Sequence, residues 1–304
     1  MDSDHRPIGV RVLARPLTRP LGLRLLLVLL LAVVGAYSVL RIGALIPTIL
    51  TQDLPPDWMQ LRFGGERVLA GESPYVWDSA LRFRWSPVAA WLLVPLTAFG
   101  PWIWTAAQFA ALVALRSLSL AVVTLLFWPF WQDVQAGNVM VFVLLAGVWA
   151  LRGNAYGIGA WFVLALLIPR PLMLPLTAWL LWKHHEWRLP FAGMAIASVG
   201  LAAVTGLLPD WIGALAASTE EVYAERWGPA VWLGLVGVIA ASGAAVVLAW
   251  RGWVGAASLL ISPYWLVYYP LVLILDLTRY TRPAGSSVPS PRSTSSPTSL
   301  SPSR

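Results

Sequence analysis

Apolar segments follow one another along most of this chain. The first runs from about residue 25 to residue 40, after a basic N-terminal stretch. The others cover residues 87–100, 102–128, 139–151, 156–168, 171–182, 190–208, 229–250 and 253–278. Segments of about 20 residues are long enough to cross a bilayer as a helix, whereas those of 12–14 are too short for a perpendicular crossing. The pattern predicts an all-α fold: a polytopic transmembrane helical bundle of about eight to ten membrane segments.

The composition excludes several classes of protein. Of the 304 residues, 58% are hydrophobic and only 12% are charged, which is about half the charged share of an average soluble domain. A soluble enzyme and a disordered protein are both excluded by this balance. The net charge is +7, but much of the excess lies at the N-terminus and in short loops, as the positive-inside rule predicts for a membrane protein. We therefore expect no nucleic-acid partner.

Charge also predicts the orientation in the membrane. Residues 1–20 are basic, which places the N-terminus in the cytoplasm. No small-x-small cleavage site follows the first apolar run, so a retained helix is favoured over a signal peptide. Residues 51–86 then form an outer loop of short juxtamembrane helices, within one multi-span membrane domain at 21–282. The Ser/Pro-rich tail at 283–304 is predicted to be disordered.

Prolines interrupt the apolar pattern at Pro169-Arg170-Pro171, which predicts two discontinuous helices. Such breaks are tolerated in a membrane where protein or a wet cavity satisfies the freed backbone groups, so a buried polar site is expected there. Arg170 either faces that cavity or extends to the membrane interface. Arg116, inside another apolar segment, either marks a turn or points inward.

The residues available for metal binding are few. The chain has no cysteine, and its three histidines, His5, His184 and His185, do not stand in a polar, pocket-like context. Neither a cysteine-ligated nor a histidine-based metal site is expected, and no cofactor is predicted.

The outer loop carries the first candidate chemistry. Asp57 follows two prolines and precedes Trp58, a context that suits a general base activating a hydroxyl group. It also suits an ordinary solvated acid at a helix N-terminus. The loop arginines can hold a phosphate, or they can contact lipid headgroups and pair with Glu66, Glu72 and Asp78. These arginines are Arg62, Arg67, Arg82 and Arg84.

Two later clusters are candidates for substrate contact. Near the C-terminus, SPYWLVYYP holds Tyr264, Trp265, Tyr268 and Tyr269, which either line a sugar or lipid channel or form an interfacial aromatic belt. Between two apolar segments, a polar group comprises Asp133, Gln135 and Asn138, with Gly137 permitting a tight turn.

Five motifs follow one another between roughly residues 50 and 270. They are Asp57-Trp58 followed by Leu69 to Tyr75, Phe83-Arg84-Trp85-Ser86-Pro87, Gly137-Asn138-Val139-Met140, Arg170-Pro171 followed by Lys183 to Arg188, and Ser262-Pro263-Tyr264-Trp265. In this order they resemble glycosyltransferase family 87, typified by bacterial mannosyltransferases that use polyprenyl-phosphate sugars. Asn138 stands where the family has Gln, and Arg170 where it has Lys, which is not an interchangeable cation.

The resemblance implies a C-type glycosyltransferase fold in a bacterial plasma membrane, with the active site at the outer face. A sugar, often mannose, would move with inversion from a polyprenyl-phosphate donor to a lipid or glycan acceptor of the cell envelope. Asp57 would be the general base, and Arg170, Arg62 and Arg84 would bind the donor phosphate. The residues that would line the substrate are Trp58, Tyr75, Trp85, Asn138, Tyr264 and Trp265. No metal would be needed, because the leaving group is a monophosphate ester, and electrostatic stabilisation of that phosphate would be the main catalytic term.

Other functions fit the same features. A transporter or a lipid-handling protein would also contain broken helices and a charged residue at the break. An inactive, shortened relative of the family is a further alternative, because the chain is shorter than is usual for the family.

Overall fold

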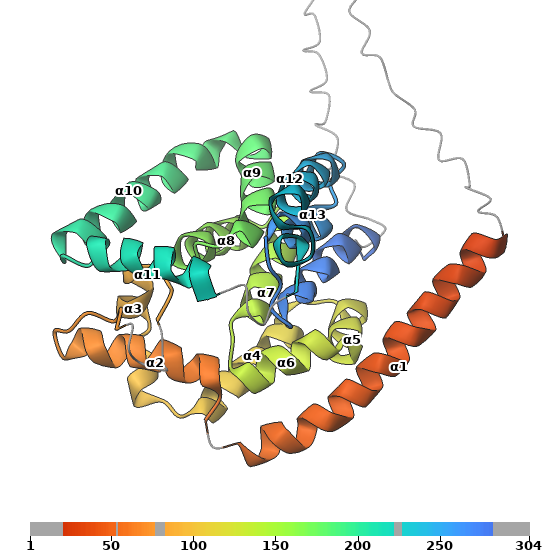
Figure 1. The fold of residues 1–304 in the computed structure, drawn as a ribbon, viewed down its shortest axis with the longest axis horizontal. Coiled ribbons are helices and arrows are strands. Elements are labelled where there is room, and N and C mark those ends of the chain that lie inside the picture. The colour runs from red at the N-terminus through yellow and green to blue at the C-terminus, as the bar shows by residue number, and fades with distance from the viewer. Residues whose placement is uncertain (1–20, 53, 77–82, 222–226, 282–304) are drawn as a thin grey trace, which may run out of the picture.

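The computed structural model describes residues 21–52, 54–76, 83–221 and 227–281, and these form an assembly of packed helices (Figure 1). The expected all-α character is therefore confirmed for the described residues. The basic N-terminal stretch, the Ser/Pro-rich tail and two charged loop residues named above lie outside the described residues. The two are Arg82 and Asp78.

Eight helices make up the first half of the described chain. They are α1 (Leu21–Thr51), α2 (Pro56–Leu69), α3 (Pro87–Leu92), the 3₁₀ helix η1 (Val94–Ala98), α4 (Pro101–Ala114), α5 (Leu118–Leu126), α6 (Trp128–Ala136) and α7 (Met140–Leu151). The second half holds α8 (Ala155–Leu167), η2 (Pro171–Met173), α9 (Leu174–Lys183), η3 (His185–Trp187), α10 (Arg188–Val204), α11 (Leu208–Glu221), α12 (Pro229–Trp250), α13 (Val254–Ile261) and η4 (Tyr269–Tyr280).

Proline and glycine explain why the apolar sequence is divided into short helices. Proline occupies the first helical residue of α2, α3, α4 and α12, where its missing N–H costs no hydrogen bond. Helices α2, α6, α7, α10 and α12 are each followed, within two residues, by a glycine with positive φ. In α6 the turn is closed by an N–H of Asn138 that donates to the carbonyl of Asp133 over 3.0 Å, a Schellman arrangement.

Two expected segments are each divided in the structure. The 102–128 segment breaks at Arg116, whose φ is 49°, and the Ser117 side chain then caps the N-terminus of α5 by accepting from the N–H of Leu120. Arg116 is exposed and marks a turn, the first of its two readings. The 253–278 segment ends its helix before Pro263, so α13 and η4 are separate elements. The predicted break at Arg170 is confirmed between α8 and η2.

Three helices in the described ranges are long and apolar enough to cross a membrane: Val28–Thr51, His185–Val204 and Pro229–Trp250. A fourth span results if the pair Pro87–Ala98 and Pro101–Ala114, bent by 113°, counts as one broken crossing. The side chains of the three long helices are mostly exposed, which suits contact with lipid. These features support an integral membrane protein.

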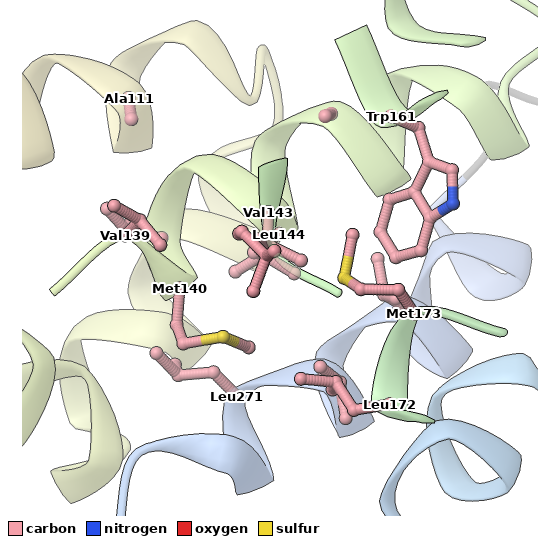
Figure 2. Packing of buried hydrophobic residues seen from close by; sticks show 14 of the residues in the cluster. Ala111, Val139, Met140, Val143, Leu144, Trp161, Leu172, Met173 and Leu271 are labelled. Atoms are coloured by element: carbon pink, nitrogen blue, oxygen red, sulfur yellow. The ribbon is translucent and has the colours of Figure 1, made fainter. Parts of the chain in front are cut away.

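The core surrounds α7, which is buried on nearly all sides. Eight of its twelve residues are buried, so no polar face remains, and Figure 2 shows Met140, Val143 and Leu144 packed beside Trp161 of α8 and Leu271 of η4. At Gly147 an added Cβ would lie 2.7 Å from Leu275 of η4, so the glycine allows the two helices to approach closely. Helix α1, in contrast, lies at the edge of the assembly (Figure 1) and packs mainly against α6.

Candidate functional site

The candidate site forms where the N-terminus of α2 meets the turn between α6 and α7. Pro56 opens α2, and Asp57 follows it in the first helical turn. Gly137 has a φ of 67°, and a Cβ built on it would lie 2.7 Å from the Cβ atoms of both Pro55 and Trp58. Only glycine fits this contact without a shift, because it both adopts the left-handed conformation and leaves room for α2. The close approach places Asn138 beside Asp57.

Asp57 is held by two hydrogen bonds from distant parts of the chain. Its Oδ2 accepts from Nδ2 of Asn138 at 2.5 Å and from the hydroxyl of Tyr268 at 3.0 Å. The same Nδ2 also lies 2.9 Å from the hydroxyl of Tyr268, so the three side chains form one cluster. Asp57 itself is half-buried. It is thus a positioned carboxylate in the first turn of a helix, and not simply a solvated one.

Tyr268 donates to Asp57 in its neutral form. Burial, followed by the adjacent Asp57 carboxylate, raises the pKa of Tyr268 well above its usual value. The phenol therefore stays protonated at physiological pH.

Arg170 is linked to this cluster by Tyr269, the residue that follows Tyr268 in the chain. Its Nη1 donates to the hydroxyl of Tyr269, and its guanidinium carbon lies 5.7 Å from the centroid of the Tyr269 ring. The rings of Tyr268 and Tyr269 are 5.8 Å apart, centroid to centroid. Two consecutive tyrosines therefore link a carboxylate on α2 to a guanidinium at the break between α8 and η2. Arg170 is half-buried and points into the protein at this contact.

The turn that carries Asn138 is itself fixed by a buried carboxylate. Asp133 is fully buried, and its two oxygens accept from the N–H groups of Met140 and Val141, each over 3.1 Å. These are the first N–H groups of α7, where a negative charge is favoured by the helix dipole. Gln108 of α4 donates to the Asn138 carbonyl at 2.9 Å. Asp133 and Gln108 thus position Asn138 beside Asp57.

The remaining candidate residues of the outer loop lie in α2 and in the segment from Tyr75 to Trp85. Trp58 is fully buried, and no described group accepts from its indole N–H. The hydroxyl of Tyr75 donates to the Trp85 carbonyl over 2.7 Å, and burial raises the pKa of Tyr75, so this donor stays protonated. Arg84 is half-buried between two buried aromatic residues, Phe83 and Trp85.

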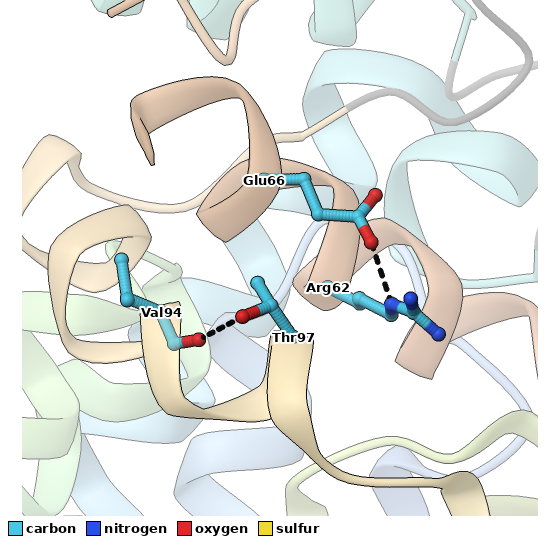
Figure 3. Close-up of polar contacts among 4 residues, drawn as sticks. All are labelled: Arg62, Glu66, Val94 and Thr97. Atoms are coloured by element: carbon cyan, nitrogen blue, oxygen red, sulfur yellow. Dashed lines mark hydrogen bonds and ion pairs between the residues drawn. The ribbon is translucent and has the colours of Figure 1, made fainter. Parts of the chain in front are cut away.

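Arg62 takes part in an ion pair on the outer side of α2. Its Nε donates to Glu66 at 2.7 Å, and its guanidinium lies 5.5 Å from the Trp58 ring centroid. Figure 3 shows this pair above η1, in which Thr97 donates to the carbonyl of Val94. Arg67 likewise pairs with Glu72 at 3.0 Å. The pairing alternative raised for the loop arginines is therefore realised for these two, and binding of a phosphate by Arg62 stays a prediction.

The C-terminal aromatic cluster divides between two environments. The ring of Tyr264 lies 6.3 Å from that of Tyr269, on the side of Arg170. The ring of Trp265 instead packs edge-on against Trp232 of α12 at 5.1 Å, and its indole donates to the carbonyl of Leu259. Trp265 thus contacts α12 while Tyr264 belongs to the tyrosine group near the candidate site.

The sequence left all four aromatic residues of this cluster as candidates, and the family resemblance singled out Tyr264 and Trp265. The structure brings Tyr268 and Tyr269 against Asp57 and Arg170. The only signal in the sequence was the tyrosine pair itself, immediately before Pro270. In the described ranges no group of three or more His, Asp or Glu side chains is placed to hold a metal ion.

Comparison with protein-family models, with curated proteins and with solved structures finds no match for this chain.

Proposed function

We propose that this protein is a membrane glycosyltransferase that moves a sugar, such as mannose, from a polyprenyl-phosphate donor to a lipid or glycan acceptor at the outer face. The proposal rests on the motif resemblance together with one observation. Asp57 and Arg170, which lie 113 positions apart, are connected through Tyr268 and Tyr269. A base for the acceptor and a cation for the leaving phosphate are the two groups that this reaction needs.

Each residue has a role in the proposed reaction. Asp57 accepts the proton of an acceptor hydroxyl while that oxygen attacks the anomeric carbon, and the bond to the donor phosphate breaks with inversion. Asn138 and Tyr268 orient the carboxylate through Oδ2. Arg170 stabilises the charge that develops on the leaving phosphate. Further substrate contacts are proposed at Arg62, Arg84, Tyr75 and Tyr264. Trp58 and Trp85 are buried and Trp265 packs against α12, so these three are not included.

The deciding experiment measures transfer of radiolabelled sugar from polyprenyl phosphate in membranes. The Asp57→Asn variant keeps an acceptor for the Asn138 and Tyr268 bonds but cannot take a proton. Loss of a general base lowers the rate by about 10²- to 10⁴-fold. The matched control is Asp210→Asn, because Asp210 also stands in the first turn of a helix, α11, and is exposed. Wild-type rates in Asp57→Asn would refute the assignment of the base.

A transporter or lipid-handling protein is the second candidate, favoured by the helix break at Arg170. Ionisable residues at such breaks often mark a substrate pathway. In reconstituted vesicles this alternative predicts movement of a labelled polyprenyl-phosphate sugar across the bilayer with no new glycosidic product. Formation of product that depends on Asp57 would exclude it.

A further inference from the structure

A second site lies away from the candidate catalytic residues, between α9 and α12. An apolar groove of about 310 Å³ runs there, and it is lined by Leu174, Pro175, Ala178, Trp179, Trp182, Ala245, Val246, Ala249, Trp250 and Ile261. No charged residue is among them. The groove is bordered by Pro229–Trp250, one of the helices long enough to cross a membrane. In a bilayer such a groove faces hydrocarbon chains.

A basic opening adjoins this groove. A second cavity of about 450 Å³ is lined by Trp179, Trp182, Lys183 and His185, so two tryptophans belong to both cavities. The Lys183 ammonium nitrogen lies 4.6 Å from the centroid of the Trp179 ring. Within the described ranges, no carboxylate is within ion-pair distance of Lys183. The apolar groove thus ends at an exposed cation, Lys183, and no carboxylate of the described residues pairs with it.

The surrounding charges favour an anionic ligand. Arg188 and Arg251 are exposed near the same helix ends, and Arg251 directly follows Trp250 of the groove. The one acid in the 183–188 loop, Glu186, lies 3.2 Å from His184. Exposed tryptophans such as Trp182 and Trp250 suit the headgroup level of a bilayer, because the indole is apolar with one polar N–H. The apolar groove, the tryptophans and the cation therefore follow one another in the order of the acyl chain, the interfacial region and the phosphate of a phospholipid.

We propose that this groove binds an anionic phospholipid, with one acyl chain along α9 and α12 and the headgroup phosphate at Lys183. The inference does not depend on the proposed glycosyltransferase activity. Arg170 lines neither cavity, so the lipid site is separate from the candidate donor site. Its role is to fix the protein to the leaflet rich in anionic lipid.

The test uses the full-length protein, purified in detergent and titrated in native mass spectrometry with phosphatidylglycerol and with phosphatidylcholine of the same chains. Phosphatidylglycerol is expected to bind more tightly. One basic residue near an anionic surface contributes an effect of about fivefold in affinity, so Lys183→Gln should weaken phosphatidylglycerol binding by about that factor and Lys183→Arg should preserve it. Ala249→Phe, which fills the groove, should weaken binding of both lipids.

Arg188→Gln is the matched control, because it removes the same charge from a nearby exposed residue, at the start of α10, that lines neither cavity. An equal loss in Lys183→Gln and Arg188→Gln would show diffuse attraction and overturn the site. Unchanged lipid binding in Ala249→Phe would refute the groove as the binding site of the acyl chain. Preferential binding of a polyprenyl monophosphate, or a dimer that Ala249→Phe dissociates, would assign the groove to another occupant and also overturn the proposal.

Discussion

Replacing Gly137 by alanine tests whether the α6–α7 turn holds the candidate site together. The substitution adds one methyl group to a residue with a φ of 67° and places it 2.7 Å from the Cβ atoms of Pro55 and Trp58. The left-handed backbone costs alanine about 1–2 kcal/mol. The forced contact with α2 adds about 1–3 kcal/mol, as overpacking does in other cores. We expect the free energy of unfolding to fall by about 2–5 kcal/mol, from these two terms.

Gly71→Ala is a closely matched control. Gly71 follows α2 with a φ of 73° and closes a turn of the same type, in which the N–H of Glu72 donates to the carbonyl of Arg67. A Cβ on Gly71 would meet nothing within 4 Å. The free energy of unfolding of this variant should therefore fall only by the backbone cost of about 1–2 kcal/mol. The difference between the two losses of unfolding free energy measures the contribution of the contact between the α6–α7 turn and α2.

The measurement is unfolding by sodium dodecyl sulfate in mixed micelles, followed by tryptophan fluorescence. The transfer assay supplies a second readout, because a displacement of about 1 Å in a catalytic group can cost about 10²-fold in rate. Equal destabilisation by the two alanines, within about 0.5 kcal/mol, would contradict the packing argument, since surface changes commonly fall in that range. Full transfer activity in Gly137→Ala would show that this turn does not position the proposed catalytic groups.

Three further predictions follow from the hydrogen bonds of the site. Asp133→Ala should lower the free energy of unfolding by about 1–3 kcal/mol, measured in the same micelles, because two N–H groups of α7 lose their buried acceptor. Glu66→Gln should change it by less than about 1 kcal/mol, since the pair with Arg62 is partly exposed; a larger loss would show that the pair organises α2. Tyr268→Phe should lower the transfer rate while costing only about 1 kcal/mol of stability, and an unchanged rate would remove Tyr268 from the proposed mechanism.

Much of the local structure could be read from the sequence, because its determinants are local. Prolines begin several helices, a glycine with positive φ ends others, and the break at Pro169-Arg170-Pro171 appears where it was expected. The lengths of the apolar helices were predicted less well than their ends. Arg116 was interpreted either as a turn or as an inward-pointing residue, and the structure makes it a turn, so one expected segment became two helices.

The candidate site was predicted only in part, because its contacts join distant residues. Asp57 and Asn138 were both selected, and the structure joins them across 81 positions. Tyr268 contacts Asp57 across 211 positions, and nothing in the spacing of residues distinguished it from Trp265, which packs against α12 instead. Which member of an aromatic cluster meets a given carboxylate depends on how α13 and η4 are packed, and that is set by the tertiary fold.

The two buried carboxylates that accept from helix N-termini differ in when they can act during synthesis. Asp133 bonds the start of α7 only seven positions ahead, so this contact can form while α7 is being made. Asp276 accepts from the N–H groups of Gly255 and Ala256, 21 and 20 positions before it. Until the ribosome has released η4, the first turn of α13 lacks this acceptor. The last helix of the described residues, η4, therefore completes the start of an earlier one, α13.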